Sequence, residues 1–338
     1  MLVEFPEDPC GRLIDVAGAL AERRRWFQDW SALRCASLGL LVVPGESRDI
    51  AERLFSDAES LSRMGRWGSQ LRGSVRYCVA AMLITRGLSP GEFHDELAIY
   101  RRHFREQKLP KHEVYETLAS LVLLGSGAHS RSAAQVERLA EIFRAMKAAE
   151  KSWFGSLTGT DDYAATALLS ETEDAIETIV ARLDRLYTGL RSVRFSRGNR
   201  LQLASHLLYF APDPDEVVID RFQRLYDGFT RRGLRMHSGD YDEVAILASL
   251  SNDPQDSIDR VLEDRNRLRA DLRPRPSLQV GFELASSTAF LSMVPASMGD
   301  ASSSLMGWQL SQVVALVQAQ QAAMMAATSG AAAAAAAS

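Results

Sequence analysis

Three polar residues at helical spacing form the strongest candidate for a binding surface. Asn199, Gln202 and His206 are three and four residues apart, and side chains at that spacing lie on one face of an α-helix. On one interpretation this face forms the wall of a polar pocket on the concave side of a helical array. The interpretation that we favour is a helix cap followed by a solvated face, with His206 hydrogen-bonded to a neighbouring helix.

A second polar segment contains two adjacent aspartates, Asp161 and Asp162, followed by Tyr163. Paired carboxylates can bind a divalent cation together with water and other ligands. At the start of a helix they more often accept hydrogen bonds from exposed backbone N–H groups and interact favourably with the helix dipole. This segment and residues 199–206 are expected to begin equivalent helices of neighbouring units, so their polar ends should lie side by side.

These six residues make up the candidate binding face, and we assign no catalytic residue, no cofactor and no metal ligand. Residues 87–91 match the pattern G-x-S-x-G, but a nucleophile elbow follows a strand, whereas this segment separates two predicted helices. A local run of arginines is expected to be a solvated face, because nearby acidic residues offset its charge. It comprises Arg182, Arg185, Arg191, Arg194, Arg197 and Arg200.

An internal sequence repeat predicts the helices that must position these residues. Residues 181–190 read ARLDRLYTGL, and residues 220–229, which lie 39 positions further on, read DRFQRLYDGF. Similarity at a fixed offset near 40 is typical of stacked helix pairs. The sequence therefore predicts an all-α fold, namely an elongated, α-solenoid-like superhelical array of antiparallel helix pairs with a repeat of about 40 residues.

Within each pair the second helix carries a clear apolar stripe. Its members recur at steps of four, three and four, which places them on one face of a helix. In one unit the stripe consists of Val218, Phe222, Leu225 and Phe229, and in the unit before it of Ile179, Leu183, Leu186 and Leu190. Arg221 falls off this face.

We expect three regions along the chain. Residues 1–70 are a helical N-terminal region that caps the array, and residues 71–295 are the helical-hairpin repeat domain. Residues 296–338 are a C-terminal helix and a disordered, alanine-rich tail, because a short isolated helix is marginal in water.

The composition restricts the partners and the compartment that we expect for the protein. The 338 residues include 39 Lys and Arg against 43 Asp and Glu, giving a net charge of −4, which argues against nucleic-acid binding through a basic surface. No apolar run reaches the roughly 18 residues of a membrane span, so we expect no membrane partner. The three cysteines are far apart and form no Cys-x-x-Cys pair, which fits a reducing compartment.

The chain resembles a bacterial family catalogued as domain of unknown function 4003. The resemblance rests on residues 157–163, LTGTDDY, on residues 198–206, GNRLQLASH, and on Ala-Leu-Leu at 167–169 between them. Similarity extends over most of residues 40–295. It implies an all-α bacterial cytoplasmic protein and supplies no activity.

A helical array without a recognisable catalytic set predicts a non-enzymatic scaffold. Such a scaffold would bind a protein or peptide partner along its concave surface. The alternative is a metal-dependent hydrolase of unrecognised type that uses a polar cleft formed by residues 161–163 and 199–206. We favour the scaffold over the enzyme and expect a cytoplasmic location.

Overall fold

The computed structural model describes residues 5–25, 28, 30–65, 69–124, 132–150 and 157–297. These residues form helices, turns and irregular segments, and none of them lies in a β-strand. The predicted all-α class is therefore confirmed.

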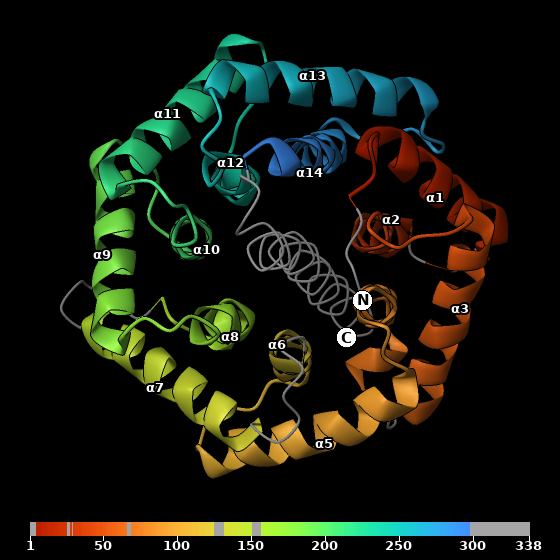
Figure 1. Ribbon diagram of the computed structural model, residues 1–338, viewed down its shortest axis with the longest axis horizontal. Coiled ribbons are helices and arrows are strands. Elements are labelled where there is room, and N and C mark those ends of the chain that lie inside the picture. The colour runs from red at the N-terminus through yellow and green to blue at the C-terminus, as the bar shows by residue number, and fades with distance from the viewer. Residues whose placement is uncertain are drawn as a thin grey trace, which may run out of the picture.

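Successive helices alternate between an outer and an inner layer (Figure 1). The outer helices of the described ranges are α1 (Pro9–Arg23), α3 (Ser47–Met64), α5 (Pro90–Glu106), α7 (Ser132–Glu150), α9 (Ile176–Ser192), α11 (Asp215–Arg231) and α13 (Pro254–Asp271). The inner helices of those ranges are α2 (Trp30–Gly39), α4 (Val75–Arg86), α6 (Glu113–Leu124), α8 (Tyr163–Ser170), α10 (Asn199–Leu208), α12 (Tyr241–Ala248) and α14 (Leu278–Ser297).

Both layers close on themselves to form two concentric rings (Figure 1). Each outer helix contacts the next outer helix, and α13 contacts α1; in the same way each inner helix contacts the next, and α14 contacts α2. The elongated shape expected from the sequence is therefore wrong. A repeated motif specifies the contact between neighbours, whereas closure depends on the small rotation that accumulates from one pair to the next.

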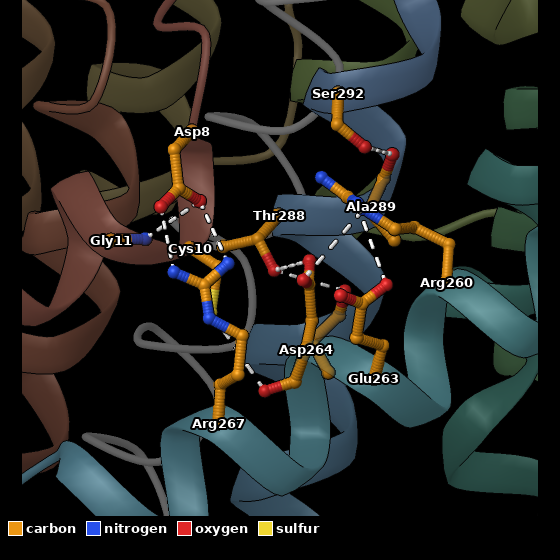
Figure 2. A network of polar contacts seen from close by, with 11 residues as sticks. Asp8, Cys10, Gly11, Arg260, Glu263, Asp264, Arg267, Thr288, Ala289 and Ser292 are labelled. Atoms are coloured by element: carbon orange, nitrogen blue, oxygen red, sulfur yellow. Dashed lines mark hydrogen bonds and ion pairs between the residues drawn. The ribbon is translucent and has the colours of Figure 1, made fainter.

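A polar network joins the first helix to the last pair (Figure 2). Asp8 accepts a hydrogen bond from the backbone N–H of Gly11, at the start of α1, and two more from the guanidinium of Arg267 in α13, at 2.9 and 2.6 Å. Beside this pair, Thr288 of α14 donates to the buried carboxyl group of Asp264 at 2.7 Å. Residues 259 positions apart in the sequence are thereby bonded where the rings close.

The repeated sequence phrase corresponds to a repeated packing contact. The predicted stripes of α9 and α11 are buried, as the sequence indicated. Gly189 of α9 lies under Ile219 of α11, and Gly228 of α11 lies under Ile258 of α13. A Cβ atom at either glycine would lie 2.2 Å from the isoleucine Cδ1, so each glycine lets the next outer helix approach closely.

Arginines of the outer helices cap the carboxyl ends of the inner helices. Their guanidinium groups donate to backbone carbonyl groups that have no partner within a helix. The bonds run from Arg138 of α7 to Ser170, from Arg182 of α9 to Ala211, and from Arg221 of α11 to Ala248, at 3.0, 2.9 and 3.0 Å. Arg221 lies off the apolar stripe and is nevertheless only 9% exposed. Arg182 belongs to the run that was expected to be a solvated face, but its side chain is 23% exposed and bonded.

The division of the chain into three regions, 1–70, 71–295 and 296–338, remains a prediction. Helices α1, α2 and α3 of the predicted cap lie in the same two layers as the other helices, and the predicted tail from residue 298 onward lies outside the described residues. Within the described ranges, no helix combines the length and the apolar character that a membrane crossing requires.

Candidate functional site

The two polar segments singled out in the sequence lie side by side at the start of α8 and α10. A 3-10 turn, Thr160–Asp162, leads into α8, and Gly198, with φ of 152°, leads into α10. Asn199 donates from Nδ2 to Oδ2 of Asp161 at 3.0 Å, and Gln202 donates from Nε2 to Oγ1 of Thr158 at 3.1 Å. The expected juxtaposition is therefore observed.

Asp162 caps the start of its helix. Its Oδ2 accepts a hydrogen bond from the backbone N–H of Gly159 at 2.9 Å, and the side chain is buried. Asp240, which precedes α12, accepts from the backbone N–H of His237 at 2.6 Å in the same manner. The Asp162 carboxylate therefore accepts a hydrogen bond from a backbone N–H group at a helix start, as the capping alternative expected.

Tyr163 joins neighbouring units. It is fully buried, and its hydroxyl donates to the backbone carbonyl of Pro110, which precedes α6, at 2.9 Å. Tyr241 at the start of α12 reaches back in the same direction, and its hydroxyl accepts from the backbone N–H of Ser196 at 3.2 Å. Tyr163 therefore fixes the spacing of inner helices and does not face a ligand.

Gln202 and His206 point between the two layers of helices. They are 5% and 2% exposed, so they form neither an open concave wall nor a solvated face. Burial lowers the pKa of His206 to about 4, and its imidazole is neutral at pH 7 as a result. Nδ1 lies 3.7 Å from Oδ1 of Asp162, which is too far for a hydrogen bond, and no ion pair forms while the ring is neutral.

His206 lines a cavity between α7, α9 and α10. Water centres could occupy about 80 Å³ of it. Its apolar walls come from Met146, Ala149, Leu157, Val180 and Leu183, and its polar lining from Asp184, Tyr187, Arg191, Arg197, Gln202, Ser205 and His206. Two of these groups have buried polar atoms without a hydrogen-bond partner in the described part of the chain, the Tyr187 hydroxyl and the His206 Nδ1.

Sequence reasoning missed Tyr187, Arg191 and Arg197 as cavity residues. Tyr187 lies within the repeated phrase, directly after the buried Leu186, and its counterpart 39 residues on is Tyr226. The ring of Tyr226 packs against Phe195 at a centroid distance of 5.2 Å. Both positions hold tyrosine, so the sequence carries no signal that marks Tyr187, and only the packing of the two rings differs.

The contacts of the two aspartates bear on the alternative of a metal-dependent hydrolase. Asp161 is bonded to Asn199, and Asp162 is bonded to the backbone of Gly159. In the ranges that the structure describes, no three His, Cys, Asp or Glu side chains gather in a manner that could hold a metal ion.

Fold and site together define a closed double ring of helices with a partly polar cavity between α7, α9 and α10. A family model described as "Protein of unknown function (DUF4003)" matches residues 62–322. The chain therefore belongs to this family. Neither the curated proteins nor the solved structures that were searched contain a match.

Proposed function

We propose that the protein is a non-enzymatic binding protein whose ligand is a small molecule held in the cavity beside His206. The observation that carries this proposal is the pair of partnerless buried polar atoms, the Tyr187 hydroxyl and the His206 Nδ1, at a cavity with room for a ligand. Leaving a buried donor or acceptor without a partner costs about 1–3 kcal/mol. A ligand that supplies a partner to the Tyr187 hydroxyl recovers this free energy on binding.

Water alone could fill part of this space, since a polar cavity of that size admits ordered water. A ligand must therefore replace the hydrogen bonds of the water that it displaces. The apolar walls favour such an exchange, because apolar atoms of a ligand gain about 25 cal/mol for each Å² removed from water. A small amphipathic molecule fits both requirements.

A protein or peptide partner is the second candidate. The observation that favours it is a groove between α7 and α9, lined by Ala145, Ala149, Val180 and Ala181, that adjoins the cavity. A peptide in this groove could place one side chain in the cavity. The concave surface is a weaker proposal for the partner, because every residue of α8 and α12 is buried.

We also propose an α-solenoid-like fold and a cytoplasmic location. The matched packing of Gly189 and Gly228 supports an α-solenoid-like array with a repeat of about 40 residues that closes into a ring. A bacterial cytoplasmic location is supported by three cysteines that are all free thiols.

The test is a thermal-shift screen of the full chain against small metabolites, with two matched variants. Ala149→Phe places a phenyl ring at the cavity, whereas Ala148→Phe places one on the exposed face of the same helix. A ligand at 100 times its Kd stabilises the folded state by about 2.7 kcal/mol. We expect compounds that raise the Tm of the wild type and of Ala148→Phe but not of Ala149→Phe. Hits that stabilise all three proteins equally would refute the cavity as the binding site.

A further inference from the structure

Acidic and basic side chains lie at the edge of the cavity and form its rim. Glu177, Asp184 and Arg191 are seven residues apart along α9, so they lie along one side of that helix with about 10 Å between successive residues. Asp184, Arg191 and Arg197 line the cavity itself, and Glu177 lines the adjoining groove with Asp184. One end of the cavity is therefore acidic and the other is basic.

The interior of the cavity holds no charge to pair with a charged ligand group. The His206 imidazole is neutral at pH 7, and Tyr187 offers only a hydroxyl that can donate or accept. A charged group buried without a partner would cost several kcal/mol. Any charge on the ligand must therefore remain at the rim, and its buried end must be neutral.

The basic end of the rim selects a negative charge. The side chain of Arg191 forms no hydrogen bond or ion pair within the described residues and is exposed. An arginine binds a carboxylate through parallel N–H donors in a fixed geometry. A phosphate monoester carries close to two negative charges and a carboxylate carries one, and the carboxylate of Asp184, which lines the same cavity, adds to the cost of the second charge.

The volume limits the size of the ligand. Water centres can occupy about 80 Å³ of the cavity, so a ligand with few non-hydrogen atoms fits, such as a short aliphatic or small aromatic acid. A single oxygen at its buried end could bond to Tyr187.

We infer that the ligand is a small monocarboxylate whose carboxylate lies at Arg191 and Arg197 and whose apolar body occupies the cavity up to Tyr187 and His206. This inference rests on the proposed function, because it names the ligand class of the same cavity.

The experiment is isothermal titration of the full chain with four matched probes: hexanoate, hexanol, hexylamine and hexyl phosphate. Wild type should bind hexanoate about tenfold or more tightly than the other three, which corresponds to 1.4 kcal/mol per factor of ten. Arg191→Gln should weaken hexanoate binding by about tenfold or more and leave hexanol binding unchanged. Arg194→Gln, which changes a neighbouring exposed arginine outside the cavity, should leave both unchanged.

The two proposals fail in different ways. Equal binding of hexanoate and hexanol, tighter binding of hexyl phosphate, or no binding of hexanoate overturns the carboxylate inference. The proposed function survives any of these results if neutral or cationic compounds stabilise the wild type but not Ala149→Phe. Binding of hexanoate that persists in Ala149→Phe overturns both.

Discussion

Replacing Gly228 with alanine tests whether the repeated sequence phrase is a packing device. The new Cβ would lie 2.2 Å from Cδ1 and 3.4 Å from Cγ1 of Ile258, whereas carbon atoms in contact are about 3.5–4.0 Å apart. Ile258 is 3% exposed, so its side chain must shift among packed neighbours to make room.

Two effects of opposite sign decide the free energy of unfolding. Alanine is favoured over glycine inside a helix by about 1 kcal/mol. Inserting a methyl group into a packed contact costs about 1–3 kcal/mol, so Gly228→Ala should destabilise the protein by about 0–2 kcal/mol. In an Ile258→Val background the Cδ1 atom is absent, and the same substitution should stabilise by about 1 kcal/mol. The double-mutant cycle should therefore show a coupling of about 1–3 kcal/mol.

The assay is urea denaturation of wild type, both single variants and the double variant. Gly18→Ala is the control, because no atom lies within 4 Å of the Cβ position there, and it should stabilise by about 1 kcal/mol. The pair Gly189→Ala and Ile219→Val should repeat the coupling one unit earlier. The reasoning fails if Gly228→Ala stabilises as much as Gly18→Ala and shows no coupling to Ile258→Val.

Three further substitutions test the buried carboxyl group, the ring closure and the arginine caps. Burial, and then neighbouring carboxyl groups, raise the pKa of Glu243 well above 4.5, so the stability that it contributes is present below pH 4.5 and is lost as pH rises toward its folded pKa. The free energy of unfolding should fall by at most about 1.4 kcal/mol per pH unit in this range, and Glu243→Gln should remove that fall. The measurement is the Tm of both proteins from pH 4 to 8. A pH dependence of Tm that is the same in the variant would contradict this role of Glu243. Arg267→Met should cost about 1 kcal/mol or less in urea, since its pair with Asp8 is partly exposed, and should increase amide hydrogen exchange in α1 above that of other outer helices. Arg221→Met should cost about 1–3 kcal/mol, because it leaves a buried carbonyl group without its donor; a Tm equal to wild type would count against the capping role.

Local features of the fold could be predicted because they depend on residues close in sequence. The apolar stripes of α9 and α11 follow from the helical period alone, and every predicted member of both stripes is buried. The juxtaposition of Asp161 and Asn199 followed from equivalent positions in neighbouring pairs. The role of Arg221 did not, because its partner Ala248 belongs to the next pair, and helical spacing on one helix does not reveal a long side chain that reaches another.

The direction of the His206 face could not be read from periodicity for a different reason. A helix that is exposed on one side shows an apolar face and a polar face, but a helix covered on all sides has no such asymmetry. Residues 201–208 of α10 are all buried, so the polar stripe through Gln202 and His206 marks where polar groups meet other buried groups and not where solvent lies. In an inner layer of this kind, a polar residue is informative only together with its partner: Gln202 is bonded to Thr158, whereas His206 Nδ1 and the Tyr187 hydroxyl have no partner within the described residues. Because buried polar atoms in folded proteins are nearly always satisfied, these two atoms, whose residues line one cavity, support the proposed ligand more than the aspartates do, since both aspartates are bonded.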